Sequence, residues 1–326
     1  MRAKAMANAN IALIKYWGKR DDKLILPQNS NIAVNLAGLT AKTSVTFDKK
    51  YKKDSFLLDG KTQSGEELAR VVDTLNRIRK LARIKDKALV MSANNFPTAA
   101  GLASSAAGGS ALVLAASKAA GLDLSNRELS ILARMNSGSS CRSIDGGFVK
   151  WVKGVRKDGK DSYGKQLFNE FYWPDFRIIV TILSTAPKKI KSRAGMKTSV
   201  ENSPFYRTWS DESERSCADM ERAIKNKDIA VLGSLAEKNA IMMHCVMFAT
   251  TPSIIYWSPE TVEVINAVHE MREKGIRCYF TMDAGPQVKI ICLKNDVKKI
   301  KNLVLKIKGV KNIIVCRPGT GAKLIA

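Results

Sequence analysis

The sequence of 326 residues is poor in the side chains that build common metal sites. It has only two histidines, His244 and His269, and its six cysteines include no C-x-x-C pair. Zinc and iron centres usually take clustered cysteine and histidine ligands. The composition therefore argues against such centres, and we expect most of the scattered thiols to be buried. Cys217, which lies in a run of charged residues, is the thiol that we expect to be exposed.

Long apolar segments and two common nucleotide-binding motifs are also missing. No apolar run reaches the roughly 20 residues of a membrane-spanning helix, and the basic N-terminus lacks the apolar core of a secretory signal. With 45% hydrophobic and 26% charged residues, the composition is that of an ordinary soluble protein, which we expect to be cytoplasmic. The chain has neither the Gly-Lys-Ser/Thr of a Walker A loop nor the Rossmann fingerprint.

The charge, in contrast, is strongly one-sided. Lys and Arg number 54 against 30 Asp and Glu, so the formal net charge is +24. Such an excess favours anionic ligands. The lysines are spread through many segments, with no basic tail and no basic stripe interleaved with aromatic residues. We therefore predict small anionic ligands, and keep a basic nucleic-acid-binding protein as the alternative from a different class.

A segment of small residues, 94–109, follows a short strand-like run at 88–91. It contains Gly101 and two adjacent hydroxyl residues, Ser104 and Ser105, and it continues into a run of strong helix formers. A strand, a turn of small residues and a helix place free backbone N–H groups and the positive end of a helix dipole around an open space. The segment predicts a phosphate site, and its alternative is small residues selected for tight packing.

Two further polar segments carry candidate ligand-binding groups. We expect a first strand at 4–9, followed by a dense polar and aromatic loop at 10–21. A turn at 137–143 brings several hydroxyl groups together with Arg142. Arginine offers a planar fork to a phosphate or a carboxylate, so this turn suits anion recognition. A polar surface turn before a strand is the alternative.

The order of the remaining segments predicts two domains. A boundary near 173–175 separates an N-terminal domain, 1–174, from a C-terminal domain, 175–326. In the first domain, Ser64 and Glu67 form a capping-box pattern that predicts the start of a helix. In the second, the chain ends with strand, strand, helix and strand, which is typical of a ferredoxin-like α+β arrangement.

Four segments together resemble the GHMP kinase superfamily and, within it, the mevalonate diphosphate decarboxylase family. They are 15–21, 94–106, 137–143 and 283–286, and they occur in the order of that family. The resemblance covers essentially the whole chain. It implies the α+β, two-domain GHMP kinase fold, with an N-terminal β/α domain, a C-terminal ferredoxin-like domain and the active site in the cleft between them.

The resemblance also implies a reaction. ATP phosphorylates the 3-hydroxyl of mevalonate 5-diphosphate, and loss of that phosphate with CO2 gives isopentenyl diphosphate, ADP and phosphate. ATP and Mg²⁺ are the implied cofactors, and a homodimer is the implied assembly. The alternatives are a mevalonate or phosphomevalonate 3-kinase and a decarboxylase of a different mevalonate phosphate. Relatives that stop at phosphorylation tend to lack an aspartate or a lysine that are both present here, as Asp283 and Lys15.

The same resemblance assigns roles to single residues. Asp283 is the base for the 3-hydroxyl, Lys15 keeps it ionised, and Arg142 fixes the carboxylate that leaves as CO2. Arg70 fits its position only with a one-residue shift in spacing, and Arg193 stands where a small hydroxyl residue is usual. The substrate-binding residues implied besides Arg142 are Tyr16, Trp17, Gly18, Lys19, Arg70, Ser137, Gly138, Ser139, Ser140, Cys141 and Arg193.

The ATP side of the cleft is assigned to the segment of small residues. Ser105 is in addition the candidate ligand of Mg²⁺. His244 and His269 are expected to have no catalytic role. The ATP-binding residues implied are Asn94, Pro97, Ala100, Gly101, Leu102, Ala103, Ser104 and Ser105.

Overall fold

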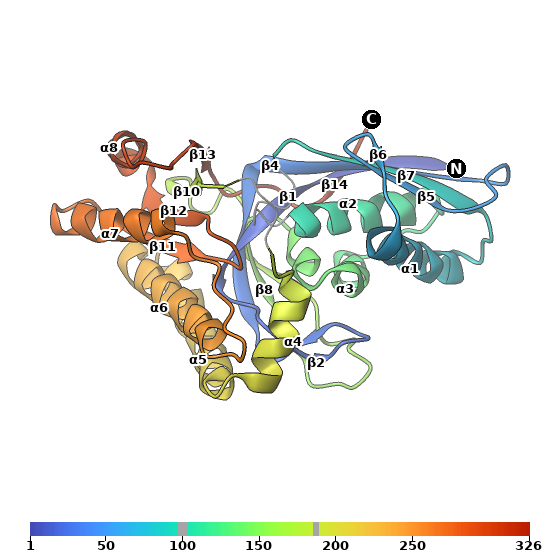
Figure 1. Cartoon of the computed structure of the whole chain (residues 1–326). Coiled ribbons are helices and arrows are strands. Elements are labelled where there is room, and N and C mark those ends of the chain that lie inside the picture. Colours follow the sequence, from blue (N-terminus) through green and yellow to red (C-terminus); the bar gives the residue numbers. More distant parts are fainter. Residues whose placement is uncertain (97–103, 185–188) are drawn as a thin grey trace.

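The computed structural model of the chain describes residues 1–96, 104–184 and 189–326. Its larger sheet has eight strands, in the order β14-β1-β4-β7-β5-β6, with β8 paired to β4 and to β9. The strands are β1 (Arg2–Ile14), β4 (Asn31–Asp48), β5 (Ser55–Leu58), β6 (Lys61–Thr62), β7 (Lys87–Asn94), β8 (Phe148–Trp151), β9 (Gly164–Phe168) and β14 (Lys323–Ile325). Helices α1 (Gly65–Ala82), α2 (Ser104–Ala119) and α3 (Asn126–Asn136) pack beneath this sheet in Figure 1, and α3 leads into the 3-10 helix η1 (Gly138–Ser143).

The second sheet has four strands in the order β11-β12-β10-β13. They are β10 (Phe176–Ile182), β11 (Cys278–Met282), β12 (Val288–Leu293) and β13 (Asn312–Cys316). The helices of this half are α4 (Ser192–Asn202), α5 (Tyr206–Lys225), α6 (Ile229–Phe248), α7 (Pro259–Glu273) and α8 (Val297–Val304). A small pair, β2 (Lys19–Asp21) and β3 (Leu26–Pro27), and the 3-10 helix η2 (Lys294–Asp296) complete the elements. The mixture of sheets and helices confirms the α+β fold class.

A single apolar core joins the two sheets. Leu13 of β1 and Val34 of β4 belong to the same buried cluster as Ile178 of β10, Ile224 of α5 and Ile291 of β12. Burying these side chains together removes apolar surface from water, which favours one fixed arrangement of the two halves. The C-terminal end of β1 is thereby held against the second sheet.

The first strand extends further than its sequence pattern indicates. The predicted loop at 10–21 is wrong for its first five residues, because β1 continues to Ile14 and pairs with β4 there, for example Ile11 with Val34. The polar Asn10 is tolerated in the buried strand because its amide donates to Ser143 Oγ and to the Ser139 carbonyl. The predicted start of the strand at residue 4 is close to the observed Arg2.

Two other local predictions are also corrected. Cys217 is only 1% exposed, because it lies on the face of α5 that belongs to the core joining the two sheets, whereas the charged neighbours lie on the other faces. Cys245 is the exposed thiol, and the other five cysteines are buried and unpaired. Ser64 stands at the N-cap of α1 as expected, but its side chain makes no capping hydrogen bond.

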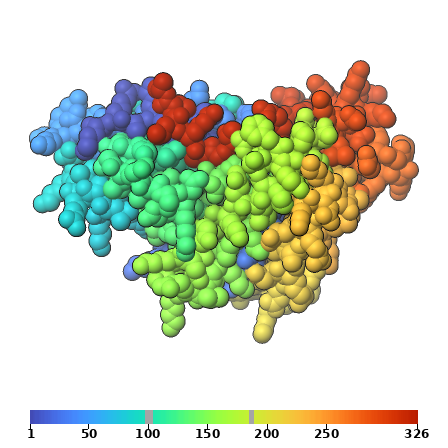
Figure 2. Space-filling view, turned by 180° about the vertical axis from the view of Figure 1, so that it is seen from behind, coloured from blue at the N-terminus to red at the C-terminus, as the bar shows by residue number. Residues whose placement is uncertain are grey.

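The C-terminal residues return to the first sheet. β14 pairs antiparallel with β1, with Lys4 opposite Ile325 and Met6 opposite Lys323. In Figure 2 these last residues, in dark red, lie beside the dark blue of the N-terminal strand. Among the described residues, no helix combines the length and the apolar character that crossing a membrane requires.

Candidate active site

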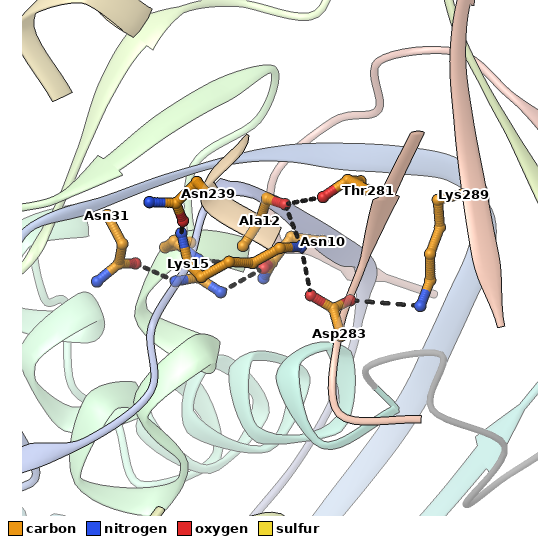
Figure 3. Close-up of polar contacts among 9 residues, drawn as sticks. Asn10, Ala12, Lys15, Asn31, Asn239, Thr281, Asp283 and Lys289 are labelled. Atoms are coloured by element: carbon orange, nitrogen blue, oxygen red, sulfur yellow. Dashed lines mark hydrogen bonds and ion pairs between the residues drawn. The ribbon is translucent and has the colours of Figure 1, made fainter. Parts of the chain in front are cut away.

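Asp283 lies between two buried lysines at the junction of the two sheets. It follows the end of β11, and Lys15 follows the end of β1. Lys15 Nζ lies 2.8 Å from Asp283 Oδ1, and Lys289 Nζ of β12 lies 3.5 Å from Asp283 Oδ2 (Figure 3). The lysine side chains are 1% and 0% exposed, whereas the Asp283 side chain is 28% exposed. The carboxylate is thus the member of this group that an incoming ligand reaches.

The two lysines determine the ionisation of the carboxylate. Burial by itself raises the pKa of Asp283, but the charges of Lys15 and Lys289 and the hydrogen bond from Lys15 hold that pKa well below its usual range. The pKa of Lys15 is lowered to about 8, chiefly by burial and to a lesser extent by the Lys289 charge, against the opposing effect of the Asp283 carboxylate. Burial also lowers the pKa of Lys289, and the charge of Asp283 opposes that shift. Around neutral pH, Asp283 is therefore an anion paired with both lysines.

Arg142, of η1, is a third buried cation at this place. Its Nε and Nη2 atoms donate to Asn10 Oδ1 at 3.2 and 3.0 Å, and its Nη1 donates to Asn31 Oδ1. Amide oxygens orient a guanidinium without neutralising it. No ion pair of Arg142 with a carboxylate is found in the part of the chain that the structure describes. The positive charge of Arg142, which also acts on Lys15 and Asp283, remains available to an anionic ligand.

The loop after β1 is fixed largely by packing. The Tyr16 ring packs against Trp151 at 4.7 Å. Trp17 is buried, and its Nε1 donates to Ser199 Oγ of α4 at 2.9 Å. Gly18 has φ +138°, and a Cβ there would overlap Tyr206. The indole of Trp17 thus anchors this loop to α4.

The side chain of Lys19, further along the same loop, is only 13% exposed, and its Nζ lies 2.6 Å from Asp22.

The predicted residues of the second turn lie in η1 and just before it. Gly138, Ser140 and Cys141 are buried, whereas Ser137 and Ser139 are partly exposed. Ser140 Oγ donates to the backbone carbonyl of Ser105 at 2.9 Å, which ties this turn to the start of α2. The Cys141 thiol is fully buried and packs in a small cluster with Trp151, and burial raises its pKa to about 12.

Two arginines from opposite halves meet beside this turn. Arg193 of α4 donates to the Asn136 carbonyl of α3 at 3.1 Å. Burial lowers the pKa of Arg193, and the positive charge of Arg70 on α1 lowers it further, so the two cations lie close together. Arg70 itself is paired with Glu67. Two neighbouring guanidinium groups suit a ligand with several negative charges.

The predicted ATP side is described only in part. Ser104 and Ser105 form the first turn of α2, and Ser105 is exposed, with the Ser137 hydroxyl 3.4 Å from its own. Asn94 is the last residue of β7, and its backbone N–H donates to Asp59 at 2.9 Å. The other predicted residues, Pro97, Ala100, Gly101, Leu102 and Ala103, lie outside the described part of the chain.

Known proteins are similar to this chain over most of its length. The family described as diphosphomevalonate decarboxylase-like N-terminal domain matches residues 7–164, and the one described as mevalonate 5-diphosphate decarboxylase C-terminal domain matches residues 178–324. The chain belongs to the diphosphomevalonate decarboxylases. A diphosphomevalonate decarboxylase of Danio rerio is 37% identical over 314 residues, which cover 91% of this chain and 78% of the relative. The diphosphomevalonate decarboxylase of Homo sapiens is 36% identical, and the match covers 89% of this chain and 76% of the human protein.

Solved structures agree with this assignment. The mevalonate diphosphate decarboxylase of Staphylococcus aureus has a TM-score of 0.94 and 40% identity. The match covers 100% of this chain and 98% of the Staphylococcus aureus chain. A structure described as MDDEF in complex with MVAPP, AMPPCP and magnesium has a TM-score of 0.93 and 39% identity. The match covers 100% of this chain and 99% of that chain. The chain is thus an ATP-dependent diphosphomevalonate decarboxylase with the two-domain GHMP kinase fold.

Several residues of this candidate site were not found from the sequence. Asn10 and Asn31 orient Arg142, Asn239 of α6 accepts from the Lys15 backbone N–H at 2.7 Å, and Lys289 pairs with Asp283. The available signal was a polar or charged residue inside an otherwise apolar strand, such as the lysine in Val-Lys-Ile-Ile-Cys-Leu of β12. Its meaning depends on which strand ends meet, and that is a property of the tertiary structure.

Proposed function

We propose that Asp283 receives the proton of the 3-hydroxyl of mevalonate 5-diphosphate while ATP phosphorylates that oxygen. The observation that carries this proposal is the partly exposed carboxylate held by Lys15 and Lys289. A carboxylate is a weak base for an alcohol, but phosphoryl transfer has a loose transition state in which the proton leaves late. A rigid position for the carboxylate therefore contributes more than its basicity, and the Lys15 ammonium stabilises negative charge nearby.

We further propose that Arg142 binds the carboxylate that leaves as CO2. Its support is a buried guanidinium that is oriented by two amide oxygens and keeps its charge. In this weakly solvated place the substrate carboxylate stays ionised and is positioned for loss as CO2 after the 3-phosphate leaves. Arg142 orients the group that is lost and leaves proton transfer to Asp283.

The substrate diphosphate is proposed to lie against the loop after β1 and the turn at η1. Arg70 and Arg193 supply two neighbouring positive charges there, and Arg193 stands in place of the usual hydroxyl residue. The buried indole of Trp17 and the buried thiol of Cys141 shape the site from behind. The residues proposed to contact or shape the diphosphate site are Tyr16, Trp17, Gly18, Lys19, Arg70, Ser137, Gly138, Ser139, Ser140, Cys141 and Arg193.

ATP is proposed to bind at the start of α2, with Mg²⁺ among its phosphates. The exposed Ser105 hydroxyl at the first turn fits this use, because Mg²⁺ on a nucleotide takes oxygen ligands, many of them from phosphates and water. No cluster of three or more Asp, Glu, His or Cys side chains suited to a metal ion occurs among the described residues. Ser105 Oγ would hold the ion, which when bound neutralises phosphate charge.

The test follows two products at once. Purified protein is given ATP, Mg²⁺ and, separately, mevalonate and each of its phosphates, while ADP and CO2 are measured together. The expected result is equal amounts of ADP and CO2 with mevalonate 5-diphosphate alone. ADP without CO2 would support a 3-kinase, equal products with another mevalonate phosphate would change the substrate, and neither product with any of them would overturn the proposal.

Asn31 provides a specific test of the charge on Arg142. Replacing Asn31 with aspartate puts a carboxylate against the guanidinium and neutralises it, so kcat/KM for mevalonate 5-diphosphate is expected to fall by about 10–100-fold, or about 1.4–3 kcal/mol. Steady-state kinetics measures this loss. The matched control is Asn312→Asp, which adds the same charge on exposed β13. A wild-type kcat/KM in the Asn31→Asp variant would show that the charge of Arg142 is not used.

Domain division, assembly and location are proposals as well. We propose domains 1–174 and 175–326, with the last strand, β14, returning to the first sheet. The single core that joins the two sheets supports their action as walls of one cleft. A cytoplasmic homodimer is proposed from the resemblance to the family, and light scattering of the purified protein at several concentrations tests the dimer.

A further inference from the structure

Lys289 is a charged residue in the interior of an apolar strand. Its neighbours in β12 are Val288, Ile290, Ile291 and Cys292, and all of them, like Lys289 itself, are 0% exposed. β12 is an inner strand of its sheet, paired with β10 on one side and β11 on the other. Removing an ammonium from water is costly, and an apolar residue of similar size is usually at least as stable there. A lysine at this place therefore calls for a functional reason.

The register of the sheet brings Lys289 to Asp283. Lys289 lies opposite Thr281 of β11, and Asp283 follows directly after the end of that neighbouring strand at Met282. Lys289 Nζ reaches Asp283 Oδ2, whereas Lys15 Nζ, from the other sheet, holds Oδ1. The two carboxylate oxygens are thus held from two directions by groups on two different sheets, as Figure 3 shows.

We propose that Lys289 is a positioning residue for phosphoryl transfer, which fixes the orientation of the Asp283 carboxylate by holding Oδ2 while Lys15 holds Oδ1. The proposal rests on the function proposed above for Asp283. With one lysine alone, the carboxylate can rotate about its Cβ–Cγ bond, and a small misplacement of a catalytic group lowers the rate strongly. With two, the oxygen that faces the substrate hydroxyl keeps one direction.

Lys289 also contributes to the charge around Asp283. Among residues 1–96, 104–184 and 189–326, the ionisable groups that act on the carboxylate are Lys15 after β1, Arg142 of η1, Lys289 of β12 and His244 of α6. Burial, together with a smaller effect of the Lys15 charge, lowers the pKa of His244 to about 3, so this imidazole is neutral in the working range. Lys289 lowers the pKa values of both Asp283 and Lys15. Removing its charge raises both.

The test is the pH dependence of Lys289→Met, whose side chain is apolar and similar in length. We expect kcat to fall by about tenfold, with ADP and CO2 falling equally and KM for mevalonate 5-diphosphate changing less than about twofold. Both limbs of the pH profile of kcat/KM, which reports the free enzyme, are expected to move to higher pH. The basic limb is expected near pH 8 in the wild type because of Lys15, and it belongs to the coupled cluster. The melting temperature is not expected to fall, because methionine suits a buried strand.

Two variants separate positioning from a structural role. Lys289→Arg keeps the charge and is expected to return both limbs towards the wild-type pH values. Ile290→Val, at the next buried position, lowers stability but is expected to leave both limbs in place. Unshifted limbs in a folded Lys289→Met variant, or a kcat loss matched by a lower melting temperature, would overturn the proposal for Lys289. A wild-type protein that forms neither product would instead overturn the proposed function.

Discussion

Replacing Asp283 with asparagine is expected to stop the formation of ADP and CO2 together, with kcat lower by about 10³-fold or more. Asparagine has almost the same shape but cannot accept a proton, and it removes the anion that Lys15 and Lys289 surround. Both products fail together because decarboxylation follows phosphorylation of the 3-hydroxyl. Coupled assays of ADP and CO2 on the same sample measure the effect.

The Asp283 variant needs a control for stability. Without the carboxylate, two buried ammonium groups lose their counter-charge, a change that commonly costs about 3–5 kcal/mol. Thermal unfolding and calorimetric titration with mevalonate 5-diphosphate establish whether the variant is folded and binds substrate. Asp211→Asn on the surface of α5 removes the same charge away from the site and should keep wild-type rates. A folded Asp283 variant that still releases CO2 would remove this residue from its assigned role.

Replacing Arg142 with glutamine is expected to lower kcat/KM for mevalonate 5-diphosphate by about 10³-fold and to raise KM. A charge-assisted hydrogen bond contributes about 1.5–3 kcal/mol, and a guanidinium makes two parallel bonds to a carboxylate. A factor of ten corresponds to about 1.4 kcal/mol, so the loss of both bonds gives this magnitude. Arg142→Lys is expected to recover only part of it, because an ammonium lacks the planar fork.

Arg134 offers a matched control for a buried arginine. It is 0% exposed, and its guanidinium donates to the Leu24, Gly159 and Ser162 carbonyls. Arg134→Gln is therefore expected to lower the melting temperature while the folded fraction keeps its KM. Comparison of the two variants separates loss of structure from loss of substrate binding. An Arg142→Gln variant with unchanged KM and kcat would contradict the assignment of the substrate carboxylate to this residue.

The sequence predicted more about the site than about the local structure around it. The family, the reaction and the α+β fold followed from four motifs, because spacing and residue type persist where chemistry demands them. The extent of β1 was underestimated, because polar residues such as Asn10 usually mark loops. Here the amide of Asn10 is satisfied inside the strand by η1. Cys217 was misplaced for a related reason: charged neighbours on a helix do not show which face is buried.

What the sequence by itself determined is the family, the reaction and the fold class. It also predicted the reacting groups, namely Asp283 after an apolar strand, Lys15 in its motif and Arg142 in a hydroxyl-rich turn, before any contact was known. What only the tertiary structure decided is how these groups are held. Lys289 and Lys15 come from different sheets, and they meet at Asp283 because one apolar core fixes the two sheets against each other. Local patterns carry no information about such long-range packing.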